Sequence, residues 1–263
     1  KYENAIKQAT LGNQMIKGVE KVAIIDSIVV NKSNFLNAYK ISEESGSLSP
    51  FNEFFETEGN NEGIVYQTEL GNKLYYGDKG KGNHLNIYTK TKLLDQWSEP
   101  ALLPTSINSG SDANYPFVMS DGITIYYASK GKGSVGGYDI FVTRYNSDTD
   151  NYLNPENVGM PFNSPFNDYM YVIDEFNNLG WFASDRYQPE GKVCIYIFIP
   201  NESKQIYDYD STDNGKLISL AKISSIKESW KGREADVKAA KERLLEARNS
   251  KPQAKENNEF EFV

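Results

Sequence analysis

Residues 120–142 carry the sequence SDGITIYYASKGKGSVGGYDIFV, in which a glycine-rich segment separates two runs of β-branched and aromatic residues. The Asp121-Gly122 pair is typical of a tight turn, because glycine adopts positive φ without steric cost. The two runs after it predict the strands of a β-hairpin. Both faces of the first strand are apolar or aromatic, so we expect neighbouring sheets to cover both of them.

This hairpin pattern recurs along the chain. Tyr75-Tyr76 returns as Tyr126-Tyr127 and again as Trp181-Phe182, and the next strand's isoleucine follows after 11, 13 and 13 residues. Residues 97–100 and 107–109 have counterparts 55 positions later. A repeat near 50 residues with several short strands per unit is the signature of a β-propeller. The alternative is a β-sandwich whose hairpins happen to be similar.

The sequence therefore predicts a mainly β fold, with a β-propeller of about four blades, in a closed or an incomplete ring, over residues 21–210. The first blade would be divergent and linked to the second by residues 48–55. The four expected ranges are 22–39, 64–104, 115–161 and, from about Tyr169, on to 199.

Helical patterns flank the expected β region. Residues 1–20 predict a short amphipathic helix that ends at Gly18. Residues 211–250 carry apolar side chains at helical spacing and predict a helical segment in two parts, separated by Gly232. Residues 251–263 predict a linker and the start of a further strand, as in a fragment of a longer protein.

Composition argues against several classes of protein. The chain has 263 residues and a formal net charge of −8, so nucleic acid is not an expected partner, because phosphate binding needs a cationic surface. No stretch approaches the roughly 18 apolar residues of a membrane-spanning helix. The single cysteine, Cys194, lies in an apolar run and predicts a buried, unreactive thiol.

The third expected blade resembles a known repeat. Residues 120–129 and 136–141 resemble the TolB-type, WD-like β-propeller repeat. Together with residues 157–168 they are similar to the version in Bacteroidota cell-envelope proteins, whose blades commonly stand beside helical repeats and OmpA-like domains. The resemblance spans residues 64–199, although the second blade has Leu70-Gly71 in place of Asp-Gly.

This resemblance implies a non-enzymatic interaction or scaffold module of the Gram-negative cell envelope. Its expected partners are envelope proteins, and its expected location is the periplasm or the outer membrane, with a leader not present in this chain. No OmpA-like domain is visible in the sequence, so peptidoglycan binding is not implied. The family supplies no catalytic residue for this chain.

Catalytic chemistry has few candidates. His84 is the only histidine, so a serine or cysteine triad would have to use it, and a multi-histidine metal site is impossible. A glycosidase, which needs only carboxylates, is the enzymatic alternative. Its candidate acids sit at turns, where Asp caps its own backbone. They are Asp121, Asp139, Asp174 and Asp185.

Two further sequence patterns resemble known functional sites but lack residues that those sites require. Residues 120–124 resemble the Asp-box turn of sialidases, but those enzymes use three arginines, and the repeats offer only Arg144 and Arg186. Residues 146–151 place oxygen side chains at alternate positions, as a calcium loop does. They lack its central glycine and indicate an acidic turn. We expect no catalytic residue, no metal and no cofactor.

The expected ligand-binding residues lie at the crossings between blades and beside acidic turns. They are Tyr138, Asp139, Asn163, Asn167, Asp168, Trp181, Asp185 and Arg186. In a carbohydrate-binding protein, which is the alternative function, Tyr138 and Trp181 would stack on sugars together with Tyr187 and Trp97. The structural alternative for residues 108–112 and 163–168 is that they satisfy backbone groups where the chain crosses between blades.

Overall fold

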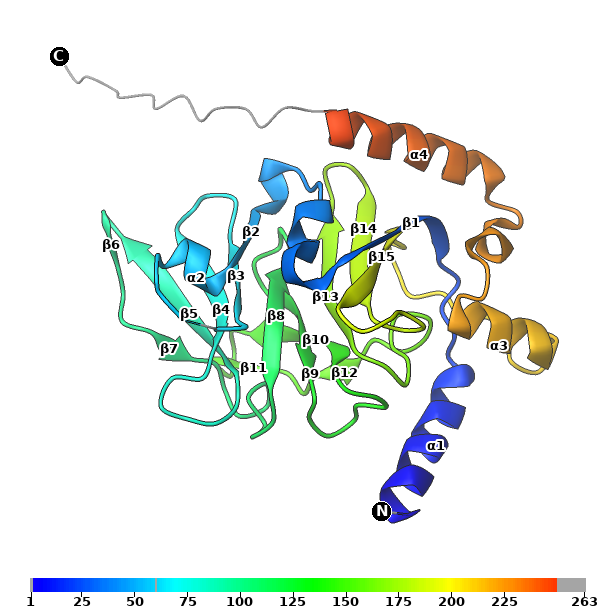
Figure 1. Ribbon diagram of the computed structural model, residues 1–263, viewed down its shortest axis with the longest axis horizontal. Helices are drawn as coiled ribbons and strands as arrows, with labels where there is room; N and C mark the ends of the chain where they lie inside the picture. Colours follow the sequence, from blue (N-terminus) through cyan, green and yellow to red (C-terminus); the bar gives the residue numbers. More distant parts are fainter. Residues whose placement is uncertain (1, 60, 250–263) are drawn as a thin grey trace.

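Three antiparallel sheets form the body of the computed structural model, which describes residues 2–59 and 61–249 (Figure 1). The first sheet comprises β2 (Ser47–Pro50), β3 (Ile64–Gln67), β4 (Lys73–Asp78), β5 (Asn86–Leu93), β6 (Gln96–Trp97) and β7 (Ala101–Leu102). The second comprises β8 (Ala113–Val118), β9 (Thr124–Ser129), β10 (Asp139–Asn146), β11 (Asn151–Tyr152) and β12 (Glu156–Asn157). The third has the order β1 (Ala23–Asn31), β15 (Lys192–Ile199), β14 (Leu179–Ser184), β13 (Asp168–Asp174).

The hairpin predicted within residues 120–142 is confirmed. Strands β9 and β10 pair antiparallel from Ser129 opposite Asp139 to Thr124 opposite Arg144. Every residue of β9 except Tyr126 is buried, so both faces of the strand are covered, as the side-chain pattern predicts. The equivalent hairpins β4–β5 and β14–β15 are also antiparallel.

The expected first blade is wrong. Residues 23–31 form β1, which pairs along its length with β15 and is the outer strand of the third sheet. Residues 32–38 form the 3-10 helix η1 (Lys32–Ala38) instead of a strand. Phe35 and Tyr39 are four residues apart, and this turn brings their rings to 6.0 Å. The described residues therefore form three sheets where four blades are expected.

Aromatic residues join the sheets at their inner strands. Strands β8 and β13 each contain a bulge, with positive φ at Tyr115 (58°) and Met170 (52°). Tyr115 and Tyr169 stack with ring centroids 4.6 Å apart, and Phe35 of η1 lies edge-on to Tyr169 at 5.6 Å. Offset and edge-to-face contacts of this kind are the favourable geometries for aromatic pairs. The cluster fixes β8, β13 and η1 together.

A buried carboxylate anchors the segment that leads into β2. Asp174, at the end of β13, accepts hydrogen bonds from the backbone N–H (2.8 Å) and hydroxyl (2.9 Å) of Ser42 and from the hydroxyl of Ser45 (2.9 Å). Ser42 precedes the short 3-10 helix η2 (Glu43–Ser45), and Ser45 is its last residue. The one-turn helix α2 (Phe51–Phe54) follows β2 and packs its phenylalanines against Tyr76 of the first sheet.

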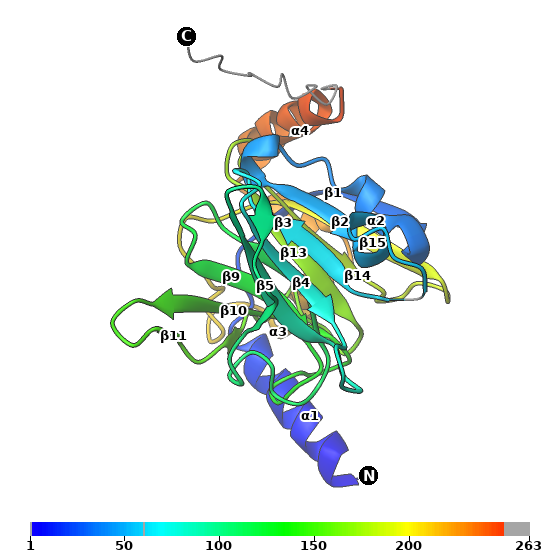
Figure 2. The same cartoon turned by 90° about the vertical axis from the view of Figure 1, so that its left-hand side faces the viewer.

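The predicted terminal helices are confirmed. Helix α1 (Tyr2–Ile16) extends away from the sheets at one end of the molecule, and α4 (Glu234–Asn249) lies at the opposite end (Figures 1 and 2). Between them in the sequence come the sheets, α3 (Asn214–Lys222) and the 3-10 helix η3 (Ile226–Trp230). Gly232, at φ 79°, separates η3 from α4. Within residues 2–59 and 61–249, no helix is long and apolar enough to cross a membrane.

Two arginines in the C-terminal half of helix α4 fasten it to the third sheet. Arg243 donates to the carbonyl of Asn177 at 2.8 Å, and Arg248 pairs with Asp26 of β1 at 2.9 Å. The apolar face of the helix, formed by Val237, Ala240 and Leu244, is buried against the core. The further strand expected within residues 251–263 lies outside the described residues.

Candidate functional site

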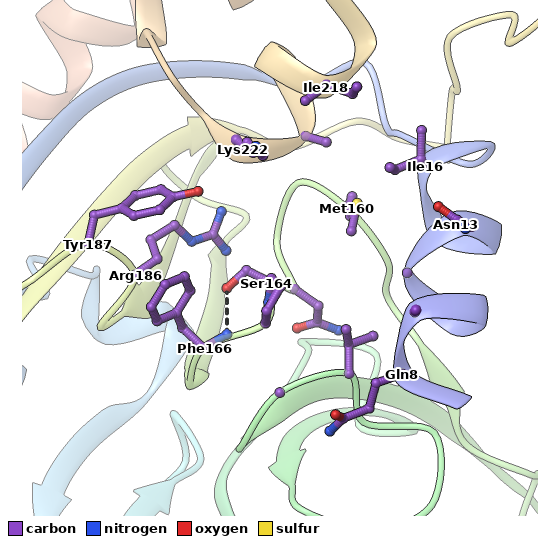
Figure 3. A pocket seen from close by; sticks show the side chains of 17 residues that line it. Gln8, Asn13, Ile16, Met160, Ser164, Phe166, Arg186, Tyr187, Ile218 and Lys222 are labelled. Carbon is purple, nitrogen blue, oxygen red and sulfur yellow. Dashed lines mark hydrogen bonds between the residues drawn. The ribbon is translucent and has the colours of Figure 1, made fainter. Parts of the chain in front are cut away.

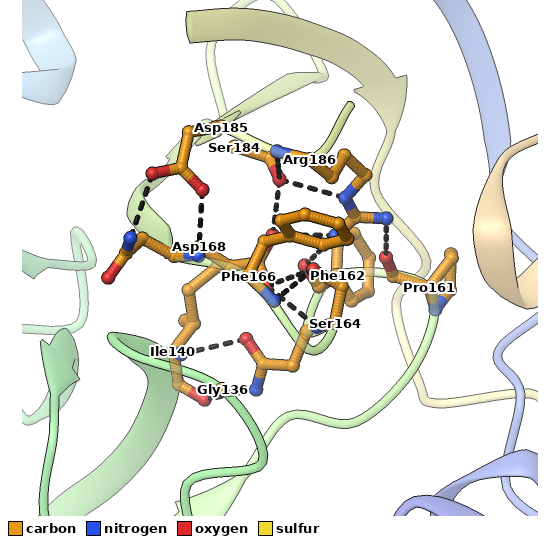
Figure 4. A network of polar contacts seen from close by, with 12 residues as sticks. Gly136, Ile140, Pro161, Phe162, Ser164, Phe166, Asp168, Ser184, Asp185 and Arg186 are labelled. Carbon is orange, nitrogen blue, oxygen red and sulfur yellow. Dashed lines mark hydrogen bonds and ion pairs between the residues drawn. The ribbon is translucent and has the colours of Figure 1, made fainter. Parts of the chain in front are cut away.

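Asp168 and Arg186 form a buried ion pair at the start of β13 (Figure 4). The guanidinium lies 2.7 Å from one carboxylate oxygen, and the exposed fractions of the two side chains are 0% and 1%. Ser184 donates to the same oxygen, while Ser164 donates to the other through its backbone N–H (2.6 Å) and hydroxyl (2.7 Å). Hydrogen bonds around a buried pair offset the cost of desolvating it.

Arg186 directs two further donors to the loop between β12 and β13 and one to Ser184 of β14. It donates to the carbonyls of Pro161 (2.8 Å) and Phe162 (2.5 Å) and to the Ser184 hydroxyl (2.8 Å). The guanidinium thus fixes this loop on the end of the third sheet. Its donors serve the protein itself, which argues for an architectural role instead of direct ligand binding.

Asn163 and Asn108 make the same contact at equivalent positions of the repeat. Asn163 accepts from the backbone N–H of Ile140 (2.8 Å) and donates to its carbonyl (2.8 Å). Asn108 makes both contacts with Ile87, at 2.8 and 3.0 Å. Each amide thus pairs with the backbone of β10 or β5 as a residue of a neighbouring strand would. The structural alternative stated for these crossings is confirmed.

Asn167 and Asp185 continue this arrangement. Asp185 accepts two hydrogen bonds of 2.8 Å from Asn167, one from its backbone and one from its amide (Figure 4). Asn167 in turn accepts from the backbone of Tyr138 at 3.0 Å. Tyr138 itself is buried, and the Lys130 ammonium lies 4.5 Å from its ring centroid. The structure thus brings these three predicted residues together, but their polar groups bind one another.

Asp139 has no exposed surface, and its carboxylate accepts hydrogen bonds from three groups. It accepts from the backbone N–H groups of Val135 (3.1 Å) and Gly136 (3.3 Å) and from the amide of Asn157 (2.8 Å). Burial raises its pKa to about 7, although these hydrogen bonds act in the opposite direction. The carboxyl group therefore titrates close to neutral pH although its side chain has no exposed surface.

Trp181 has no exposed surface and lies in the main hydrophobic core. A ring buried on both faces cannot stack on a sugar, so the binding role expected for Trp181 does not fit its position. All other residues of β14 are buried as well, so both faces of this strand are covered. Of the other aromatics expected to stack, Trp97 is partly buried and Tyr187 is 62% exposed.

The candidate acids do not meet in one open cleft. Asp121 caps its own turn by accepting from the backbones of Ile123 and Thr124 and from the Thr124 hydroxyl. Burial raises its pKa, but these hydrogen bonds outweigh burial and leave the pKa below its usual value. Asp139 and Asp174 also accept from backbone N–H groups within four residues, which is the capping role that the turn positions predict. Asp185 instead accepts from the backbone of Asn167, 18 residues away.

A groove of about 540 Å³ lies beside the Asp168–Arg186 network, between α1, α3 and three loops of the second and third sheets (Figure 3). We call it the helix groove. Arg186 and Asn163 contribute to its floor, so the network described above supports it. Its principal lining residues are Gln8, Asn13 and Ile16 of α1, Met160, Ser164 and Phe166 of the β12–β13 loop, Tyr187, and Ile218 and Lys222 of α3.

The helix groove is apolar with a cationic edge. Ile16, Met160 and Ile218 supply apolar surface, and Phe166 and Tyr187 form an edge-to-face pair at 5.2 Å. No aspartate or glutamate is among the described residues that line it. Lys222, in the last turn of α3, is exposed and has no ion-pair partner in the described part of the chain.

The repeat pattern leads to Asn163 and Arg186 but not to the residues that make the groove accessible. Met160 and Phe166 lie in the segment that resembles the repeat but were not expected site residues, and Lys222 lies outside the repeats. Helices α1 and α3 lie about 200 residues apart in the sequence. Their contact with each other is a product of tertiary folding. Comparisons with protein-family models, curated proteins and solved structures found no match to this chain.

Proposed function

We propose that the chain is a non-enzymatic interaction module of the β-propeller type, which binds a segment of a protein partner in the helix groove. Three antiparallel sheets with successive strands, and aromatic contacts between their inner strands, support a radial arrangement of blades. The position of β1 beside β15 also supports it, because an early strand then completes the last sheet.

The observation that carries the binding function is the helix groove. Binding sites are typically concave, mostly apolar and furnished with a few polar groups, and the groove of about 540 Å³ has this character. Two helices and three loops shape it, so it is built by distant parts of the chain. Helix α1 also exposes Ile6 (65%) beyond the groove, which extends the apolar surface that a partner could cover.

The polar groups of the groove favour a peptide segment that carries a carboxylate. Gln8 and Asn13 of α1 offer amide groups for a peptide backbone. Lys222 offers an unpaired ammonium at the edge, and the lining contains no carboxylate that would compete for it. An apolar segment with one Asp, Glu or terminal carboxylate would therefore satisfy both the lining and the cation.

The same lining favours binding over glycan cleavage. Glycosidases need two carboxyl groups at the scissile bond. The carboxyl groups of Asp139, Asp168 and Asp185, which stand within three residues of the lining along the chain, are hydrogen-bonded within the protein, and the first two are buried. The resemblance of residues 120–141 to envelope-protein repeats supports envelope proteins as partners and a periplasmic or outer-membrane location. Both remain part of the proposal.

Site-specific photocrosslinking tests this function. A benzophenone amino acid replaces Phe166 in the groove of the full chain, which is produced in its native cells, and irradiation should yield a defined protein adduct. The matched control carries the benzophenone at Leu153, which is 51% exposed and outside the groove. The charge reversal Lys222→Glu, in the Phe166-labelled chain, should reduce the adduct at least tenfold.

The outcomes separate the alternatives. An adduct of equal yield from positions 166 and 153 would mean that the groove has no special role. A glycan adduct at position 166, or loss of a hydrolytic activity in Asp139→Asn, would replace the proposal with the carbohydrate function. Unfolding temperatures of all variants, measured by circular dichroism, exclude misfolding as the cause of a lost adduct.

A further inference from the structure

A second pocket, of about 480 Å³, lies at the other end of the inner strands. It sits among the β3–β4, β8–β9 and β13–β14 turns, so each of the three sheets contributes one turn to it. We call it the turn pocket. Strand β13 begins at the helix groove and ends here, and its seven residues separate the two sites by about 20 Å.

The floor of the turn pocket is apolar and rigid. Phe117, Val118 and Tyr66 come from β8 and β3 and are almost fully buried, and the Tyr66 hydroxyl donates to the carbonyl of Val118 at 2.9 Å. Tyr66 and Phe117 meet edge-to-face at 5.0 Å. A floor held by strand residues and a buried hydrogen bond offers a preformed surface.

The rim of the turn pocket exposes large apolar side chains. Leu70, in the β3–β4 turn, is 75% exposed, and Phe176, in the β13–β14 turn, is 70% exposed. Both stand at repeat-related turns on either side of the floor. Exposed apolar groups around a concave floor are typical of surfaces that a partner covers.

The charge at the rim is negative. Glu44, Glu69 and Glu175 line the pocket and are exposed. Glu175 accepts one hydrogen bond from the Ser120 backbone (3.0 Å), which orients its carboxylate. The one lysine in the lining, Lys73, directs its ammonium to the Tyr75 ring, 5.1 Å from the centroid. The chain as a whole carries a net charge of −8, so no general positive field offsets this rim.

From this combination we infer that the turn pocket is a second docking site, which takes a short protein segment that combines Lys or Arg with an apolar side chain. The apolar side chain would lie on Phe117 and between Leu70 and Phe176. The basic group would pair with Glu44 and Glu69, which have no ion-pair partner in the described part of the chain. Complementary charge of this kind confers specificity and speeds association.

The inference goes beyond the helix groove, because the two sites favour partners of opposite charge. A module with an acid-selective groove at one end and a base-selective pocket at the other would hold two different segments at once. The two sites share no lining residue. Each can therefore be altered without touching the other, and the two proposals fail separately.

Selection from a random heptapeptide display library tests the inference. The full chain is immobilised, and the variants are the double charge reversal Glu44→Lys/Glu69→Lys, the rim change Phe176→Asp, and Lys222→Glu as the helix-groove control. All four substituted residues are exposed, so the fold should persist, and thermal unfolding checks it. Peptides enriched on the unmodified chain but not on the double reversal are synthesised and titrated by calorimetry.

We expect these peptides to pair Lys or Arg with an aliphatic or aromatic residue. Their binding should weaken at least tenfold in Glu44→Lys/Glu69→Lys and in Phe176→Asp, remain unchanged in Lys222→Glu, and weaken with added salt. Selected peptides without a basic residue, binding insensitive to the charge reversal, or no enrichment above an unrelated acidic protein would each overturn the inference.

Discussion

Asp139 illustrates how burial changes the chemistry of a single residue. Its position at the start of β10 predicts a turn carboxylate, and the structure places it without exposed surface among three donors. The pKa near 7 follows from burial and not from a catalytic partner. A raised pKa is often taken as a sign of an active site, but here the Asp139 side chain has no exposed surface and does not line the helix groove.

The pH dependence of stability tests this interpretation of Asp139. Since its pKa rises from an ordinary value of about 4 to about 7, unfolding releases a proton in this window, and stability should fall as pH rises, by up to about 1.4 kcal/mol per pH unit. The variant Asp139→Asn cannot ionise. Its amide faces the same donors and lowers the free energy of unfolding by an amount that does not change with pH. Urea unfolding at pH 5 to 8 should show the unmodified chain losing stability relative to the variant.

Asp121→Asn is the matched comparison, because hydrogen bonding lowers the pKa of Asp121. The stability that this carboxylate contributes is complete above about pH 4 and is lost only as pH falls through its lowered pKa. The cost of Asp121→Asn should therefore stay constant between pH 5 and 8. A pH-independent difference for Asp139→Asn as well would show that Asp139 does not hold its proton near neutrality.

Among the structural elements, the connections between sheets share the same hydrogen-bonding pattern. Asn108 and Asn163 stand 55 positions apart and each pairs with both backbone groups of one strand residue. The repeat in the sequence thus marks a repeated structural task. It does not mark a ligand site, because a buried amide with its bonds complete has little left to offer a ligand.

Removing either amide should destabilise the protein without changing its surface. In Asn163→Ala the buried N–H of Ile140 loses its partner, while its carbonyl keeps the N–H of Val158, so the variant should cost about 1 to 3 kcal/mol. Asn108→Ala should behave alike, because the Ile87 carbonyl keeps the N–H of Leu103. Asn151→Ala is the control, because its exposed side chain only accepts from the next backbone amide, and it should cost under about 0.5 kcal/mol. Denaturant unfolding measures all three, and equal small effects would contradict the assigned role.

The elements predicted correctly are those with strong local patterns. The hairpins follow from runs of β-branched and aromatic residues, and α1 and α4 from helical spacing. The first blade was wrong because an alternating run such as residues 23–31 specifies a strand but not its partner. The partner, β15, lies about 165 residues further along the chain. Likewise, Phe35 and Tyr39 fit a strand or a helical turn, and the aromatic contacts in the core favour the turn.

For the whole molecule, the pairing of β1 with β15 joins the two ends of the β region. Val29 lies directly opposite Cys194, and side chains opposite each other in an antiparallel pair are on the same face. The substitution Val29→Cys should therefore form a disulfide with Cys194 under mild oxidation, since such pairs lie within disulfide range. Closing so long a loop should raise the free energy of unfolding by about 2 to 4 kcal/mol.

Non-reducing electrophoresis and thiol titration measure this cross-link. Leu245→Cys is the control, because it is exposed on α4 and is not opposite Cys194, so both its thiols should stay titratable. Reduction should return the Val29→Cys variant to the stability of the unmodified chain. Two free thiols in oxidised Val29→Cys would mean that β1 does not close the third sheet in solution.

The amino-acid pattern alone was enough to establish a mainly β chain with repeated hairpins between terminal helices, because turns, side-chain alternation and helical spacing are local properties. Tertiary structure decided the number of sheets, the burial of Trp181 and Asp139, and the two pockets. Each of these depends on contacts between residues far apart in the sequence, and local propensity carries no information about which distant segment will cover a given face.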